Sequence, residues 1–446
     1  MNDPRGNPVG TTSADAVAAT ERALWRMMSF YGTPMEDLDA AAQADPHWLL
    51  PLLMKAGFLL SLTEPPLVKD AVALLDQADV LAAHTDAQAS TRERRHLHAL
   101  RRLAAGDWHG ACSAWEALLL NHPCDALALQ WAHLFDFYRG DATQLRQRVA
   151  RVLPEWDAAD PLHPYVLGLH AFGLEECNLY AEAEDTGRHA LNGTAKVPWA
   201  IHAVAHVMEM QGRVDEGVAW MAHWQPHWAQ GNGFSGHLGW HQALFALESL
   251  DHQRALQLFD EHLRADPSHI TLQRLDAAAL LWRLHLLGVD VGPRWQQLLD
   301  GWNPKPANAG HYAFNDVHGL LGLIGAQDMA RAHAWAQTVA RHAETASGAN
   351  RDMALHVAVP LMQGLLAFAE GRDRAAISAL YTVRAEAHRF GGSHAQRDLI
   401  TQTLLAAAGR APDAAVGRAL LNERQLGKPV TPLTQHWLQQ IGLPLR

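Results

Sequence analysis

Apolar residues recur every three to four positions along almost the whole chain, which is the spacing of one face of an α-helix. Gly-Asp, Asp-Pro and His-Pro steps interrupt these patterns at short intervals, as turns between helices do. The last pattern, Leu433, Trp437 and Ile441, lies in the closing segment and predicts a capping helix. Alternating apolar and polar runs, which are typical of strands, are scarce. We therefore predict an all-α fold.

The patterns divide the chain into four parts. We expect a disordered tail at residues 1–12 and an irregular N-terminal helical region at residues 13–92. Residues 93–268 show repeated helix pairs, and residues 269–446 continue as C-terminal helical repeats and capping helices.

Small residues recur at equivalent positions of the helix pairs. Positions 111, 145, 183, 217 and 255 follow one another in steps of 34, 38, 34 and 38 residues, and four of the five are Ala or Gly, with Leu145 as the departure. A later unit repeats the pattern with Ala376 and Leu380. A helix pair of about 34 residues is the tetratricopeptide unit, in which small residues let neighbouring helices approach closely. The spacing therefore predicts a tetratricopeptide-like solenoid with a curved superhelical shape.

Several longer stretches are similar to segments of the tetratricopeptide-repeat protein 38 family. The stretches that carry the resemblance are HPYVLGLHAFGLEECNLYAEAE (163–184), IHAVAHVMEMQGRVDEG (201–217), GWHQALFALE (239–248), FNDVHGLLGLIGA (314–326) and GGSHAQRD (391–398). The chain resembles a bacterial-type member of that family. The resemblance implies an all-helical curved repeat fold and brings no settled activity with it.

Composition narrows the class of partner. The formal charge is −11 with acidic and basic residues interspersed, so we expect no nucleic-acid partner. The longest apolar runs, such as 48–54 and 277–282, are too short to span a bilayer, and we expect no membrane partner. Three cysteines are too few for a disulfide framework, and the N-terminus lacks an apolar secretion segment. We therefore expect a cytoplasmic location.

Histidines are the most distinctive feature of the middle of the chain. His202 and His206 are four residues apart on a predicted helix, and Glu209 follows three residues later on the same face. His237 and His241 repeat the spacing in the next helix pair. Because leading helices of adjacent repeats lie side by side, we expect these four imidazoles and the carboxylate to converge in one groove.

Other polar residues are expected to line the same groove. They are His170 and Glu175 from the preceding leading helix, Trp240 beside the histidines, Asp316 and His318 from FNDVH, and Arg397 and Asp398 from GGSHAQRD. In that last segment Gly391 and Gly392 fit a helix end, and Ser393 with Gln396 fits the capping box of the next helix. Arg397 can grip a carboxylate or phosphate, or form a buried ion pair.

Three interpretations of the histidine cluster are open at this stage. The rings can be hydrogen-bonded packing residues between helices. They can bind a divalent metal through His202, His206, His237 and His241, although the stronger H-E-x-x-H motif is absent because Ala203 stands where its Glu would be. They can also form a metal-free pocket in which histidine and glutamate exchange protons or bind a polar ligand.

The sequence favours binding over catalysis. Phosphate-binding glycine loops and the G-x-S-x-G elbow are absent, and Cys177 follows two glutamates that disfavour a thiolate. We expect a binding protein that takes a peptide or small polar ligand in a concave groove lined by His, Trp and Arg. The alternative is an enzyme in which His202, His206, Glu209 and His241 carry acid–base chemistry or hold a metal. A third alternative is a homo-oligomer that associates through its terminal apolar faces.

Overall fold

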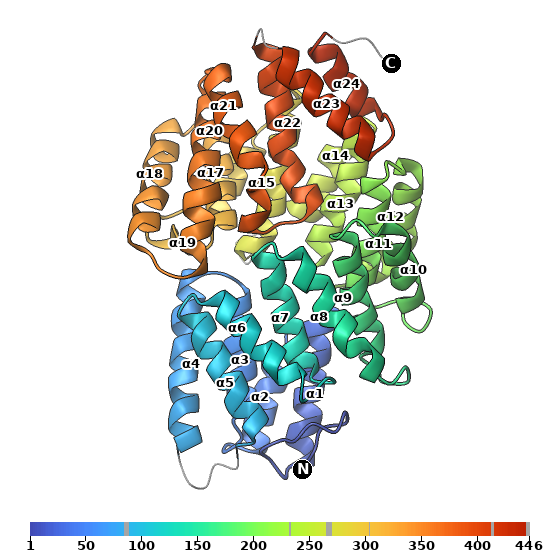
Figure 1. Ribbon diagram of the computed structural model, residues 1–446, viewed down its shortest axis with the longest axis vertical. Helices are drawn as coiled ribbons and strands as arrows, with labels where there is room; N and C mark the ends of the chain where they lie inside the picture. Colours follow the sequence, from blue (N-terminus) through green and yellow to red (C-terminus); the bar gives the residue numbers. More distant parts are fainter. Residues whose placement is uncertain (84–88, 232, 265–269, 303, 412–413, 443–446) are drawn as a thin grey trace. The chain divides into compact units, whose positions relative to one another are not determined.

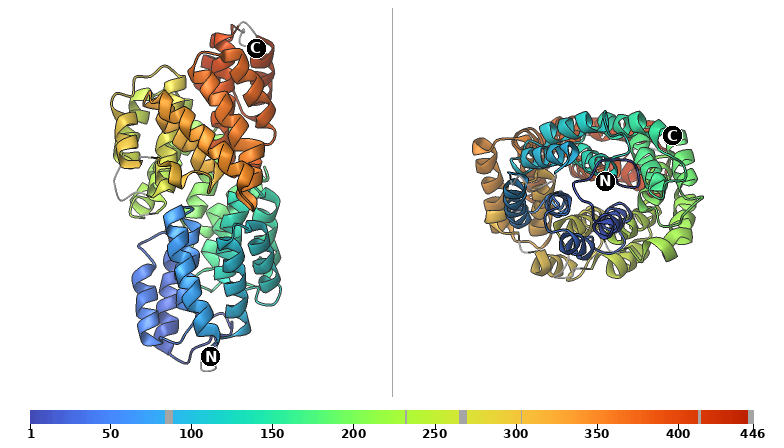
Figure 2. Two further views of the ribbon diagram at one scale, coloured as in Figure 1. Left: turned by 90° about the vertical axis from the view of Figure 1, so that its left-hand side faces the viewer. Right: turned by 90° about the horizontal axis from the view of Figure 1, so that it is seen from below.

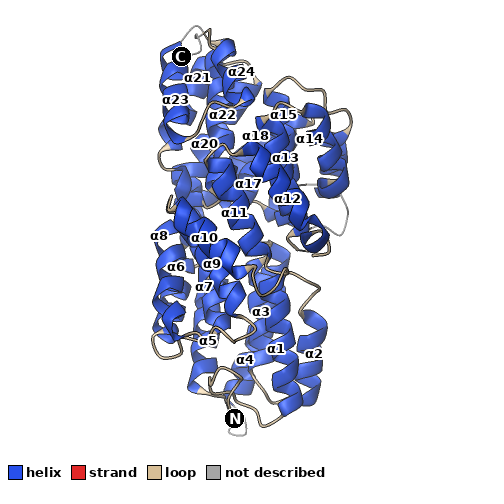
Figure 3. Cartoon of the chain, turned by 90° about the vertical axis from the view of Figure 1, so that its right-hand side faces the viewer, coloured by secondary structure: helices blue, strands red, loops and turns tan. Residues whose placement is uncertain are grey.

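The computed structural model describes residues 1–83, 89–231, 233–264, 270–302, 304–411 and 414–442. Within these ranges the regular elements are helices, joined by short turns, together with one isolated backbone bridge between Asn2 and Pro8. Figures 1 and 3 show the helices following one another along the chain, each packed against the next. The fold is an all-α helical repeat, as the apolar periodicity predicts.

The chain folds into two compact units. The first consists of residues 1–204 and 227–234, and the second of residues 205–226 and 235–446. The division falls inside two helices, α11 (Pro198–Met210) and α12 (Val214–Trp228).

The first unit is a succession of helices that pack on their sequence neighbours, as Figure 2 shows. Its helices are α1 (Ala14–Ser29), α2 (Met35–Ala44), α3 (Leu50–Ser61), α4 (Pro65–Ala83), α5 (Thr91–Ala104), α6 (Trp108–Leu119), α7 (Ala126–Tyr138), α8 (Ala142–Val152), the 3₁₀ turn η1 (Leu153–Glu155), α9 (His163–Glu175), α10 (Tyr180–Ala190) and the first part of α11. Asp107, Asp125 and Asp141 begin α6, α7 and α8 by accepting backbone N–H groups of the first turn. These caps satisfy donors that a helix start would otherwise leave unpaired.

The second unit continues the same arrangement. Its helices are the remainder of α11, α12 (Val214–Trp228), α13 (Ser235–Glu248), α14 (His252–Leu258), the π-helical turn η2 (Phe259–Leu263), α15 (Thr271–Leu286), α16 (Arg294–Trp302), the 3₁₀ turn η3 (Pro306–Asn308), α17 (Ala313–Gly325), α18 (Met329–Thr345), α19 (Ala349–Met353), the π-helical turn η4 (Ala354–Ala358), α20 (Val359–Ala369), α21 (Asp373–Arg384), the 3₁₀ turn η5 (Ala387–Phe390), α22 (His394–Arg410), α23 (Ala414–Gly427) and α24 (Pro432–Gln440). The last two residues of α12 belong to the first unit. The closing pattern of Leu433 and Trp437 is buried in α24, so the predicted capping helix is present.

The repeat positions found in the sequence are buried where helices touch. Ala111, Ala183 and Ala255 have no exposed surface, and Leu145 is buried as well. At Gly217 on α12 an added Cβ would lie 2.2 Å from the ring of Phe245 on α13. The small residues therefore set how closely neighbouring helices approach.

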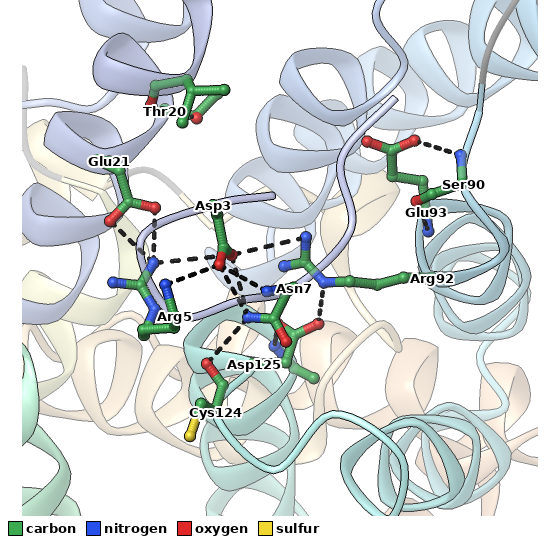
Figure 4. A network of polar contacts seen from close by, with 12 residues as sticks. Asp3, Arg5, Asn7, Thr20, Glu21, Ser90, Arg92, Glu93, Cys124 and Asp125 are labelled. Atoms are coloured by element: carbon green, nitrogen blue, oxygen red, sulfur yellow. Dashed lines mark hydrogen bonds and ion pairs between the residues drawn. The ribbon is translucent and has the colours of Figure 1, made fainter. Parts of the chain in front are cut away.

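The N-terminal tail has a defined structure. Arg5 binds the carboxylate of Glu21 on α1 at 2.6 and 2.8 Å, and the side chain of Asn7 donates to Asp3 and to the carbonyl of Cys124 (Figure 4). Arg92 on α5 lies 3.9 Å from the Asp3 carboxylate. The disordered tail expected at residues 1–12 is thus replaced by a buried polar network. Its partners are distant in sequence, so no local pattern could indicate them.

Among the described residues, one helical stretch is long and apolar enough to cross a membrane by length and composition. It runs from Ala349 to Ala369 with a mean hydropathy of 1.4 in its most apolar window, and 61% of that window is buried inside the fold. Polar residues interrupt this stretch in the sequence, so it is not a continuous apolar run. Burial against α17, α18 and α21 accounts for its apolar character as a core helix.

Candidate functional site

Three of the predicted histidines meet in the second unit. The ring of His241 on α13 lies 4.4 Å from that of His206 on α11 and 4.8 Å from that of His237, measured between ring centres. Each of the three rings offers a nitrogen, and these nitrogens lie within 4.8 Å of one another. His206 and His241 are fully buried, and the His237 side chain is 16% exposed. The repeat spacing thus brings the two helices together at this point.

Two of these rings, those of His237 and His241, form hydrogen bonds with carboxylates. Nδ1 of His237 donates to Oδ2 of Asp276 on α15 at 2.9 Å, and a 3.3 Å hydrogen bond joins Nδ1 of His241 to Oε2 of Glu209. Both contacts fix the plane of the imidazole and the nitrogen that faces its carboxylate. His237 also stacks on Trp240 with ring centres 5.3 Å apart.

Burial shifts the pKa values of His241 and Glu209. Desolvation holds the pKa of His241 well below its ordinary value, and the neighbouring charges of His206, His237 and Arg283 lower it further. Desolvation also raises the pKa of Glu209 to about 7, although Lys428 and His206 act in the opposite direction. His241 is therefore neutral at ordinary pH, because a charged imidazole is costly in an interior of low polarity.

Arg283 is a buried cation next to the cluster. Its guanidinium on α15 is 1% exposed, donates to the carbonyl of Ala395 at 2.7 Å and lies 5.4 Å from the ring centre of Trp240. Desolvation lowers its pKa, and the charges of Asp398, Glu209 and Asp276 oppose that shift. Arg283 therefore links α15 to the first turn of α22 while the surrounding carboxylates compensate its charge.

A pocket opens beside Glu209 in the second unit. It has a volume of about 450 Å³ and lies between the end of α11, η5, α22 and α23. Its charged lining residues are Glu209, Arg384, Arg397, Asp398, Glu423, Arg424 and Lys428, with His394 beside them. Glu209, Arg397 and Asp398 were expected at the groove from the sequence.

A buried ion cluster forms one wall of this pocket. Arg424 donates to both carboxylate oxygens of Asp398, at 2.9 and 3.1 Å, and to Glu248 at 3.0 Å. Lys428 donates to the same oxygen of Glu248 at 2.5 Å, and Thr431 to the other oxygen at 2.6 Å. Although burial opposes it, Arg424 holds the pKa of Asp398 down to about 2, and Lys428 and Arg424 lower that of Glu248. Both carboxylates are therefore ionised at neutral pH.

The start of α22 is built as the sequence predicts. Ser393 accepts the N–H of Gln396, and the Gln396 side chain accepts the N–H of Ser393, so the capping box is confirmed. Gly391 and Gly392 both have positive φ, and a Cβ at Gly392 would lie 2.4 Å from the ring of Phe314. Arg397 donates to the carbonyl of Gly392 and thus borders the pocket from this turn.

Other predicted residues lie elsewhere. Asp316 on α17 accepts the N–H of Gly310 at 3.1 Å and does not line the pocket, whereas His318 donates from Nδ1 to the carbonyl of Phe314 at 2.8 Å. Burial raises the pKa of Asp316 to about 7 and lowers that of His318 to about 4.

Three predicted residues belong to the first unit. The ring of His202 on α11 lies 5.0 Å from that of Phe172 and 5.1 Å from that of Phe234, measured between ring centres. His170 and Glu175 are on α9, where burial lowers the pKa of His170 and Glu175 is fully buried.

Sequence reasoning missed several residues of the site. They are Glu248, Asp276, Arg283, Arg424 and Lys428. Two signals were available. Asp276 and Arg283 are the isolated charges of an otherwise apolar run, which predicts buried partners. Arg424 and Lys428 are like charges four residues apart, one in the last turn of α23 and one directly after it, and such a pair is unfavourable without acidic partners.

The similarity of this chain to known proteins is distant. No protein-family model matches the chain. A tetratricopeptide repeat protein from Parabacteroides merdae ATCC 43184 is similar in structure, with 13% identity, a TM-score of 0.35 and coverage of 65% of this chain and 99% of its own. The structure of the APC/C hetero-tetramer Cut9-Hcn1 matches with 12% identity and a TM-score of 0.43. The match covers 99% of this chain and 79% of the other. Yeast Tom70 matches with 12% identity and a TM-score of 0.37. The match covers 96% of this chain and 86% of Tom70.

At these identities the assignment of class depends on the chain's own helix pairs. Their repeat positions are buried at helix contacts, and helix follows helix in each unit. The protein is an all-α helical-repeat protein.

Proposed function

We propose that the protein binds a small polar ligand or a peptide end that carries an acidic group, in the pocket beside Glu209. The observation that carries the proposal is the wall of Arg424 and Lys428 on a pocket of about 450 Å³. That volume is within the range of pockets that hold small molecules. The proposal keeps the binding function expected from the sequence and gives it a specific location.

The charges of the lining favour an anionic ligand group. Four cationic side chains border the pocket, namely Arg384, Arg397, Arg424 and Lys428, against the three acidic side chains Glu209, Asp398 and Glu423. Burial raises the pKa of Glu209, so this acid contributes less negative charge at neutral pH than the other two. The lining is therefore positive in balance.

Lys428 is the side chain best placed to meet the ligand. Its ammonium has three N–H donors, and one of them binds Glu248. Arg424 is less available, because Asp398, Glu248 and Thr434 already accept from its guanidinium. A carboxylate or phosphate oxygen at Lys428 would add a charge-assisted hydrogen bond.

The test compares defined probes on the full chain. Native mass spectrometry would measure binding of a mixture of tetrapeptides with free C-terminal carboxylates, the same mixture with C-terminal amides, succinate and inorganic phosphate. We expect binding of a probe that carries an acidic group, with affinity reduced about tenfold or more in Lys428→Met, because one charge-assisted hydrogen bond contributes about 1.5–3 kcal/mol. Methionine keeps the unbranched shape and most of the length of the side chain, and Glu248 keeps Arg424 and Thr431 as partners.

The matched control is Lys305→Met, which removes an exposed lysine of the same unit outside the pocket. It should bind like the wild type. The proposal fails if the wild-type chain binds none of the four probes, or if Lys428→Met binds them equally well. The enzyme alternative, the cytoplasmic location and the resemblance to the tetratricopeptide-repeat protein 38 family remain predictions from the sequence.

A further inference from the structure

We propose that His206, His237 and His241 bind a divalent transition metal of the Zn²⁺ type. The proposal concerns the histidine cluster and does not depend on the ligand proposed for the pocket. It selects one of the three interpretations that the sequence left open.

Convergence of the rings is the first argument. Three imidazoles from α11 and α13 bring a nitrogen each to within 4.8 Å of the others. Zn–N distances are about 2.0–2.1 Å, so ligand nitrogens around one ion lie roughly 3.4 Å apart. Small side-chain rotations close that difference, because the rings are already 4.4 and 4.8 Å apart between centres.

The second argument is the orientation of the rings. Asp276 binds Nδ1 of His237 at 2.9 Å, and Glu209 lies 3.3 Å from Nδ1 of His241. A carboxylate on one imidazole nitrogen is the usual support of a histidine that binds metal through the other nitrogen. Such a partner fixes the tautomer and makes the ring a better ligand. The metal-facing atoms of His237 and His241 would therefore be the two Nε2 nitrogens.

Burial is the third argument. His206 and His241 are fully buried, so an ion bound between them would lie away from bulk solvent. Zn²⁺ takes four ligands, so a water molecule or another group would complete the coordination. A set of imidazoles suits Zn²⁺ better than Mg²⁺ or Ca²⁺, which prefer oxygen.

The experiment uses the purified full chain, stripped with EDTA and then loaded with Zn²⁺. Elemental analysis after gel filtration measures the stoichiometry, and competition with a chromophoric chelator measures the affinity. Loading with Co²⁺ adds the visible absorption of a nitrogen-coordinated cobalt ion as a second readout. We expect about one equivalent of zinc in the wild type.

Two ligand variants separate binding from folding. His237→Asn changes the most exposed of the three rings and should leave the helical circular dichroism unchanged, and His241→Gln changes a buried one. Both should lower the zinc affinity by on the order of 100-fold or more, because each removes a direct ligand. Asp276→Asn should lower it about 10–100-fold, as loss of a supporting carboxylate does.

His262→Asn is the matched control. The His262 side chain is 14% exposed, close to the 16% of His237, and it also lies near a carboxylate, 3.8 Å from Glu261, but it is outside the cluster. It should bind zinc like the wild type, as should Lys428→Met, so that loss of pocket binding and loss of metal are distinguishable. Less than about 0.1 equivalent of zinc in the loaded wild type, or unchanged affinity in folded His237→Asn, would overturn the proposal and leave a packing cluster.

Discussion

At the scale of single residues, the second unit buries ionisable groups in two different ways. Glu248 and Asp398 keep their charge because Arg424 and Lys428 neutralise it within hydrogen-bond distance. Burial dominates at Asp316 and raises its pKa to about 7, although a hydrogen bond from the backbone N–H of Gly310 acts in the opposite direction. The nearest partner therefore decides whether a buried carboxyl is charged.

The pKa of Asp316 predicts a pH dependence of stability. Its folded pKa of about 7 lies above the ordinary value of 3.8, so the folded chain holds this proton more tightly than the unfolded chain does. The resulting stabilisation is complete below about pH 4 and is lost as pH rises to about 7, by on the order of a few kcal/mol. Thermal unfolding between pH 4 and 8 should show that this loss is smaller in Asp316→Asn than in the wild type.

Asparagine keeps the shape of the side chain and an oxygen that accepts from Gly310. Asp352→Asn is the control, since its side chain is 64% exposed. It should follow the wild-type curve. Identical pH profiles for Asp316→Asn and the wild type would contradict the prediction.

At the scale of helices, small residues decide how closely neighbours pack. Gly217 on α12 is the clearest case, because a Cβ there would lie 2.2 Å from Phe245 Cε1 and Cζ, both in the rigid ring of a buried side chain. The sequence indicated this position through its place in the repeat and could not indicate which residue faces it.

Gly217→Ala should therefore destabilise the chain even though alanine favours helices. The clash forces the ring or the helix to move, which costs about 1–3 kcal/mol and outweighs the roughly 1 kcal/mol gained in helix propensity. Urea unfolding followed by circular dichroism would measure the change. Gly427→Ala on α23 is the matched control, since nothing lies within 4 Å of its added Cβ, and it should be neutral or stabilising. Equal stability of the two variants would refute the packing argument.

At the scale of the whole molecule, neither unit is one continuous stretch of the chain. Residues 227–234 return to the first unit after part of α11 and most of α12 have contributed to the second. In the first unit Phe234 stacks on Phe30 at the end of α1, with ring centres 5.0 Å apart, and Tyr31 donates to the carbonyl of His227. The segment 227–234 is therefore part of the first unit, whose other residues are 1–204.

Phe234→Ala should loosen a helix that is two hundred residues away in sequence. Loss of the half-buried ring removes contacts with Phe30 and Trp199 and should cost about 2 kcal/mol. Hydrogen–deuterium exchange should become faster in the last turn of α1. Val218→Ala on α12, where the residue is 44% exposed, is the control and should leave that exchange unchanged. Unaltered exchange of α1 in Phe234→Ala would show that the segment does not support the first unit.

Local periodicity determined the helices, the repeat positions at 111, 145, 183, 217 and 255, and the capping box at Ser393, because these depend on residues three to four apart or on a regular step. The same spacing placed His206 and His241 on helices that meet. Only the tertiary structure decided the partners of the buried charges, the ordered tail at residues 1–12 and the division inside α11. Those features join residues far apart in the chain. A charged residue in the sequence does not indicate which distant residue will neutralise it in the fold.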